Sequence, residues 1–147
     1  MKRSIFTITL AFLLAFVIGF SAVPVHVSAA TTEAAQQKKI AKKFNKFLKK
    51  HFYDSDALHY DISYKKTGKR YTFTMTLTTK QMNIDYIHGA AFINDNYSKM
   101  IKALSATSKK QFKNAKILGL KKPIVNVVWI SSDGVKVATI KNGVLIE

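Results

Sequence analysis

The sequence of 147 residues contains no cysteine, two prolines, six glycines and only eight acidic residues. Without cysteine the chain forms no disulfide bond, no thiolate zinc site and no iron–sulfur cluster, and it has no cysteine nucleophile. The acidic residues are outnumbered by 24 Lys and Arg, which gives a formal net charge of +16. That charge favours acidic partners and disfavours cation-binding surfaces. Hydrophobic residues make up 48% of the chain, too many for a disordered protein, and the length suits one domain.

Residues 1–29 have the layout of a secretory signal peptide. Lys2 and Arg3 precede an apolar run over residues 5–20, and Val27-Ser28-Ala29 offers a cleavage site. The alternative is an uncleaved membrane anchor, but a helix over that run spans only about 24 Å, less than the ~30 Å hydrocarbon core. We therefore expect cleavage after Ala29, export from a bacterium, and a secreted, extracellular or cell-wall-associated protein.

Cleavage after Ala29 leaves 118 residues with 22 Lys and Arg and eight Asp and Glu. Residues 30–37 are small and polar, and we expect a flexible leader there. The remainder, residues 38–147, is predicted to form a single α+β domain. From Lys38 onward Ile40, Phe44, Phe47 and Leu48 recur at helical spacing, which predicts an amphipathic helix whose other faces carry lysine.

Two segments alternate with period two and predict a β-hairpin. Leu58 to Tyr64 alternates apolar with polar residues, and so does Tyr71 to Thr78. The polar link over residues 65–70 contains Gly68, as expected for a hairpin turn. One row of the second strand consists of threonines, which are typical of a solvent-facing strand side; these are Thr72, Thr74, Thr76 and Thr78.

Helical spacing returns between about Asp85 and Ala106, with an interruption expected near residues 94–96 and a further helical turn within residues 111–120. The apolar run from Ile124 to Ile130 predicts a strand buried on both faces. Asp133-Gly134 then predicts a turn into a returning strand, and Asn142-Gly143 predicts another. The resulting fold class is α+β, with the order α-β-β-α-β-β. We expect a small antiparallel sheet of about four to five strands with two helices on one face.

Basic residues gather in two segments, and these are the candidate anion-binding residues. On the first helix they are Lys38, Lys39, Lys42, Lys43, Lys46, Lys49 and Lys50; in the hairpin link they are Lys65, Lys66, Lys69 and Arg70. The helix has two interpretations: its apolar stripe inserts into an anionic membrane, or the stripe packs on the sheet and leaves a cationic outer face. The second is favoured, because the aromatic strand faces need a cover. In both cases the surface attracts polyanions.

Enzymatic and metal-binding alternatives have weak support. His59, Asp61 and Ser63 are the residue types of a hydrolytic triad, but alternate residues on a strand lie roughly 7 Å apart, too far for proton transfer. His51, His59, His88, Asp54, Asp56 and Asp61 match no zinc or calcium spacing. We therefore predict no catalytic residues, no metal and no cofactor.

Two kinds of macromolecular partner remain. Tyr64 and Tyr71 flank the hairpin lysines, as in proteins that bind single-stranded nucleic acid. In the alternating pattern, however, both tyrosines fall on the side of the strand that faces the core. Arg70 is the single Arg after the signal peptide. This scarcity of Arg argues against sequence-specific nucleic-acid recognition. A protein partner is the other candidate, bound at an edge strand or at the loops around Asp54 and Asp133; Trp129 is expected in the core.

The sequence thus predicts an exported, non-enzymatic binding protein. Its lysine-rich surface would associate with anionic material outside the cell, such as a wall polymer, anionic lipid or extracellular DNA. The alternative is a secreted protein-partner module, that is, an inhibitor, an immunity factor or a toxin-related factor.

Overall fold

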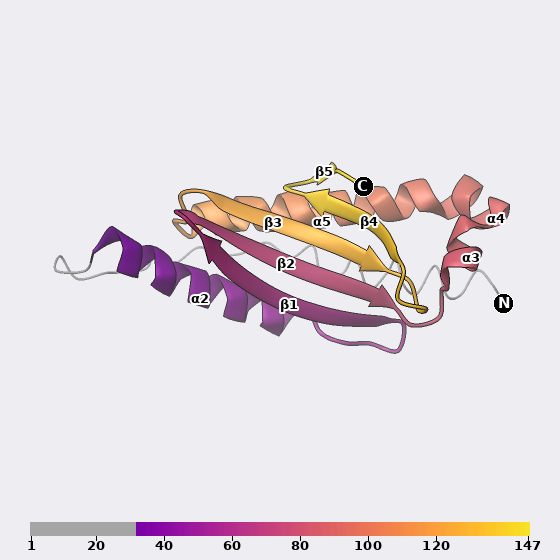
Figure 1. The fold of residues 1–147 in the computed structure, drawn as a ribbon, viewed down its shortest axis with the longest axis horizontal. Coiled ribbons are helices and arrows are strands. Elements are labelled where there is room, and N and C mark those ends of the chain that lie inside the picture. The colour runs from indigo at the N-terminus through magenta and orange to yellow at the C-terminus, as the bar shows by residue number, and fades with distance from the viewer. Residues whose placement is uncertain (1–31) are drawn as a thin grey trace.

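The computed structural model describes residues 32–147, which form one five-stranded sheet with helices beside it (Figure 1). The predicted signal peptide, residues 1–29, lies outside the described residues. The helical elements are α2 (Glu33–His51), α3 (Ile84–His88), α4 (Ala90–Phe92), the π-helix η1 (Ile93–Tyr97) and α5 (Ser98–Ile117). The strands are β1 (Leu58–Thr67), β2 (Arg70–Thr79), β3 (Pro123–Ile130), β4 (Lys136–Lys141) and β5 (Val144–Leu145). The expected α+β class and the order α-β-β-α-β-β are confirmed.

The strands lie in chain order across the sheet, from β1 to β5, but the sheet is mixed rather than wholly antiparallel. β1 and β2 form the predicted hairpin, and β3–β4 and β4–β5 are also antiparallel. β2 and β3 run parallel, with Tyr71 beside Pro123 and Thr78 beside Ile130. The cause is the helical connection between them. At 1.5 Å per residue, α5 is roughly 30 Å long, which is enough to return the chain to the end at which β2 begins.

The long helices α2 and α5 lie on one face of the sheet, as expected (Figure 1). On α2, the buried residues Ile40, Phe44 and Leu48 face the sheet, and the Phe44 ring meets Phe73 of β2 edge-on at 4.8 Å between centroids. On α5, the Ser108 hydroxyl donates to the Val125 carbonyl of β3 at 2.9 Å. The apolar stripe of α2 is therefore part of the core, which agrees with the favoured interpretation of this helix.

α2 begins at Glu33, five residues earlier than Lys38, so residues 33–37 are helical instead of belonging to a flexible leader. Thr32 caps the helix, because its hydroxyl accepts a hydrogen bond from the Ala35 amide at 3.3 Å. Gln37, one turn further on, holds the start of α2 against the loop between α5 and β3. The composition of these residues gave no sign of this tertiary contact.

The core lies between the helices and the sheet. Alternate residues of the inner strands point into it, among them Met75, Leu77 and Trp129, which are almost fully buried. The expectation that β3 is buried on both faces is wrong: Val125, Val127 and Trp129 are buried, whereas Ile124 and the other alternate residues are half-buried. Thr72, Thr74, Thr76 and Thr78 of β2 share this second, partly exposed face.

The connection between β2 and β3 is interrupted once, at Gly89, whose backbone is extended between α3 and α4. The expected interruption at residues 94–96 is instead a π-helical stretch, η1, through which α4 continues into α5. α5 itself extends to Ile117, so the predicted extra turn belongs to the same helix. In residues 32–147 we found no helix with both the length and the hydropathy required to cross a bilayer.

Candidate anion-binding site

The hairpin turn, the loop that leads into β3 and the end of β4 lie together at one end of the sheet. Parallel pairing of β2 with β3 sets Tyr71 beside Pro123, so the hairpin lysines lie next to Lys121 and Lys122. Asn126 pairs with Lys141, which brings the β4–β5 turn to the same end. Segments that are far apart in the sequence therefore form one basic region.

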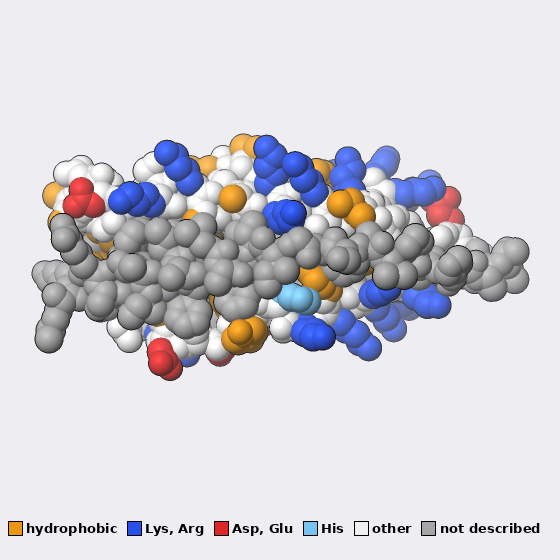
Figure 2. Space-filling view, turned by 180° about the vertical axis from the view of Figure 1, so that it is seen from behind, with side chains coloured by type: hydrophobic (Ala, Val, Ile, Leu, Met, Phe, Trp, Pro, Cys, Tyr) orange, Lys and Arg blue, Asp and Glu red, His pale blue; other side chains and the backbone are white. Residues whose placement is uncertain are grey.

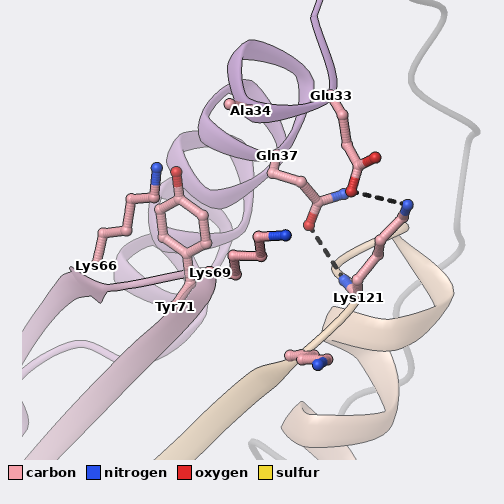
Figure 3. A pocket seen from close by; sticks show the side chains of 8 residues that line it. Glu33, Ala34, Gln37, Lys66, Lys69, Tyr71 and Lys121 are labelled. Atoms are coloured by element: carbon pink, nitrogen blue, oxygen red, sulfur yellow. Dashed lines mark hydrogen bonds and ion pairs between the residues drawn. The ribbon is translucent and has the colours of Figure 1, made fainter.

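A first hollow of about 440 Å³ opens between the start of α2, the hairpin and the loop before β3 (Figure 3). Its lining residues are Glu33, Ala34, Gln37, Lys66, Lys69, Tyr71, Lys121 and Lys122. Four ammonium groups thus face one carboxylate. In Figure 3 the Tyr71 ring stands between the side chains of Lys66 and Lys69. The Lys66 nitrogen lies 5.9 Å from the centroid of that ring, within the range of a cation–π contact.

The rear wall of this hollow is held by contacts between α2 and the α5–β3 loop. The Gln37 amide nitrogen donates to the Gly119 carbonyl at 2.9 Å, and its amide oxygen accepts from the Lys121 backbone at 3.1 Å. The Lys121 ammonium pairs with Glu33 at 2.8 Å, and this hydrogen bond and charge lower the pKa of Glu33. The one carboxylate of the hollow is therefore already neutralised by Lys121.

A second hollow of about 280 Å³ adjoins the first and shares Lys121 and Lys122 with it. It is lined by Arg70, Phe112, Lys116, Lys121, Lys122, Pro123, Ile124, Lys141 and Asn142. Phe112 is half-buried beneath the Lys116 ammonium, which lies 5.2 Å from its ring centroid. We call the seven cations of the two hollows the basic band; they are Lys66, Lys69, Arg70, Lys116, Lys121, Lys122 and Lys141. The band crosses from β1 to β4, a width of about 15 Å at the usual strand spacing.

Most carboxylates lie away from the basic band. Asp54 and Asp56 precede β1, Asp85 belongs to α3 and Asp133 lies in the β3–β4 turn, all at the opposite end of the sheet. In Figure 2 the blue Lys and Arg side chains extend along the helix side, whereas most of the visible red carboxylates lie toward the end that carries α3 and α4. The field at the basic band is therefore little compensated by neighbouring acidic groups.

The structure brings only part of the predicted residues into this site. Lys66, Lys69 and Arg70 line the hollows, and Lys65 is exposed on β1 beside them. The seven lysines of α2 line neither hollow. They are all exposed and lie around the outer face of the helix, opposite its buried stripe. They form a second cationic surface.

Sequence reasoning missed Lys116, Lys121, Lys122 and Lys141. The pair Lys121-Lys122 directly before Pro123 was a visible signal, because it places two cations at the start of a predicted strand. No local pattern marks Lys116 or Lys141. Only the packing of α5 and β4 around the start of β3 brings them to the site.

The other candidate residues act within the fold. The Asp54 carboxylate accepts from the Tyr60 amide at 2.8 Å and contacts the His59 ring at 2.6 Å, and these contacts lower the pKa of Asp54. The Asp133 carboxylate accepts from the Ser131 hydroxyl at 2.5 Å and from the Ile84 amide at 3.1 Å. Asp54 and Asp133, whose loops were the candidate sites for a protein partner, thus stabilise those loops through their carboxylates. Among the described residues, no three His, Asp or Glu side chains gather closely enough to hold a metal ion.

We compared the chain with models of protein families, with curated proteins and with solved structures, and found no match in any of the three. The function is therefore argued from the geometry and charge of the described residues.

Proposed function

We propose that the protein is a non-enzymatic binding protein that acts outside the cell and holds a phosphate-bearing polymer at its basic band. The observation that carries this proposal is the meeting of seven cations from four separate segments around two adjoining hollows, with one carboxylate that is already paired. When a flexible polyanion lies across the band, several of its phosphates would release their bound counterions at once. Its affinity for the protein would therefore weaken steeply as the salt concentration rises.

A polymer is favoured over a membrane surface by the packing of α2. Peripheral helices bind bilayers by burying an apolar face among the acyl chains. The apolar face of α2 is occupied, because Phe44 and Leu48 are fully buried against the sheet. Its exposed lysines would still attract an anionic surface from a distance, which would raise the local concentration of a polymer ligand.

A polymer without bases is favoured over nucleic acid by the aromatic residues. Binding of single strands without sequence preference depends on aromatic side chains on which bases stack. At the basic band Tyr71 is buried and Phe112 lies beneath Lys116. The strongly exposed aromatic residue of the described chain, Tyr53, lies in the loop between α2 and β1 and lines neither hollow.

The test is binding of labelled inorganic polyphosphate to the purified mature protein at about 50 and about 500 mM salt, between which the screening length falls about threefold. We expect retention at the lower concentration and loss at the higher one. Retention at neither concentration, or equal retention at both, would overturn the proposal. If an oligonucleotide binds more tightly than the same oligonucleotide without bases, the ligand class is nucleic acid and not a polymer without bases.

A further inference from the structure

The hollow between α2 and the hairpin contains a hydroxyl group that the fold does not use. Tyr71 is 4% exposed, and its phenolic oxygen is buried without a hydrogen-bond partner among the described residues. Buried polar groups almost always have partners, so an orphaned hydroxyl calls for an explanation. Burial, with a smaller contribution from Tyr64, raises the pKa of Tyr71, so its hydroxyl keeps its proton and remains a donor.

The groups around this hydroxyl suit a tetrahedral anion. Lys66 and Lys69 flank the ring from the hairpin (Figure 3), and Lys122, in the loop before β3, also lines the hollow. Lys66 and Lys69 are exposed at the end of a hairpin, so movement of their flexible stems gives access to the hydroxyl. A phosphate group presents several acceptor oxygens, enough to engage these ammonium groups and the hydroxyl together.

We infer that this hollow is a seat for a single phosphate group of the bound polymer, in which the Tyr71 hydroxyl donates to a phosphate oxygen and Lys66, Lys69 and Lys122 neutralise its charge. The inference rests on the proposed function and narrows it, because the rest of the basic band acts through charge alone. The seat sets the position of the polymer along the band. It also favours phosphate over a carboxylate polymer of equal charge.

The test is the variant Tyr71→Phe, which removes only the hydroxyl. Its control is Tyr60→Phe, because the Tyr60 hydroxyl is also buried and without a partner but lines neither hollow. Affinity for polyphosphate and for a base-free oligonucleotide is measured at about 50 mM salt, with polyglutamate as the carboxylate probe. We expect Tyr71→Phe to weaken both phosphate probes by at least about tenfold, as for loss of a hydrogen bond to a charged group. Binding of polyglutamate should change less, and Tyr60→Phe should leave all three affinities unchanged.

Melting curves without ligand separate this effect from damage to the fold. Removal of an orphaned hydroxyl should leave the melting temperature of Tyr71→Phe unchanged or slightly higher. If Tyr71→Phe does not fold, Lys69→Gln replaces it, with Lys50→Gln on the outer face of α2 as its control; Lys69→Gln should weaken phosphate binding several-fold more than Lys50→Gln.

The two proposals fail in different ways. If the wild-type protein binds no polyanion at low salt, both are wrong. If the wild-type protein binds the phosphate probes and Tyr71→Phe binds them equally tightly, the proposed phosphate seat is wrong. The proposal that the basic band binds a polyanion would then still stand.

Discussion

The salt dependence of polymer binding should distinguish the basic band from the lysines of α2. The perturbation is the triple variant Lys66→Gln, Lys69→Gln and Lys122→Gln, which leaves Lys121 in place because it pairs with Glu33. The matched control removes the same charge from α2, through Lys46→Gln, Lys49→Gln and Lys50→Gln. The control positions lie roughly 13–20 Å along the helix axis from Gln37, beyond the ~8 Å screening length at 0.15 M salt.

The magnitude follows from the number of cations at the band. Each contact with a flexible phosphate chain adds about 0.7 to the slope of log affinity against log salt. Lys121 is neutralised by Glu33, which leaves six cations to engage the polymer. The wild-type slope is then about −4.2, and the band variant should show about −2.1. From 50 to 150 mM salt the wild-type affinity would fall about 100-fold and that of the band variant about tenfold.

The assay is fluorescence anisotropy with a labelled base-free oligonucleotide at three salt concentrations between 50 and 150 mM. The α2 control should flatten the slope only slightly, through a small loss of affinity at the lowest salt, where long-range attraction is least screened. If the α2 control flattens the slope as much as the band variant does, the polymer lies along α2 and our placement of the site is wrong.

Three further predictions concern the fold. Phe44→Ala should destabilise the protein by about 3–5 kcal/mol in calorimetry, because Phe44 is fully buried against Phe73; an unchanged melting temperature would show that α2 is not packed on the sheet. Gly143→Ala should cost more than about 2 kcal/mol and Gly134→Ala about 1–2 kcal/mol in urea unfolding. Both glycines have positive φ, but a Cβ on Gly143 would lie 2.7 Å from the Lys109 Cβ, whereas Gly134 has open space; equal costs would contradict this. The hydrogen bonds from the Tyr60 amide and from His59 lower the pKa of Asp54 in the folded protein. The ionised Asp54 therefore contributes to the free energy of unfolding above its unfolded pKa of about 3.9, and this contribution is lost as the pH falls through the folded pKa. Asp54→Asn should therefore lower stability at pH 6 by less than about 1 kcal/mol, because the group is half-exposed, and have less effect at pH 2; an equal loss at both pH values would contradict this assignment.

The local patterns predicted most of the secondary structure. Period-two alternation located both strands of the hairpin, and the helical spacing of Ile40, Phe44 and Leu48 identified the buried stripe of α2. Each of these patterns is complete within a few residues. The start of α2 was placed too late, because residues 33–37 are held by Gln37 across a distance of more than 80 residues in the sequence.

The candidate site was only partly predictable because it depends on the direction of one strand pair. The hairpin lysines and Lys121 lie about fifty residues apart, and β2–β3 pairing alone determines whether they meet. In the antiparallel sheet that we expected, the start of β3 would lie at the end of β2, and Lys121 and Lys122 would be at the opposite end of the molecule. The parallel pairing, with Tyr71 beside Pro123, brings them to the hairpin turn. Because β3 was expected to run antiparallel to β2, neither the basic band nor the hollow beside Tyr71 could be predicted from the sequence.

The basic band does not help the protein to fold. Two like charges about 8 Å apart repel by about 0.5 kcal/mol in a water-like dielectric and by more near a protein surface. Seven cations line the two hollows, and Glu33 is the single carboxylate among the lining residues. The folded state tolerates this repulsion because its stability comes from the apolar core around Trp129 and Phe44. An anion bound at the band would relieve this repulsion, so the charges that oppose folding would favour the proposed complex. The hollow beside Tyr71 thus holds an excess of positive charge and a hydroxyl without a partner, and neither stabilises the free protein. A bound phosphate group would neutralise the charge and accept a hydrogen bond from the hydroxyl.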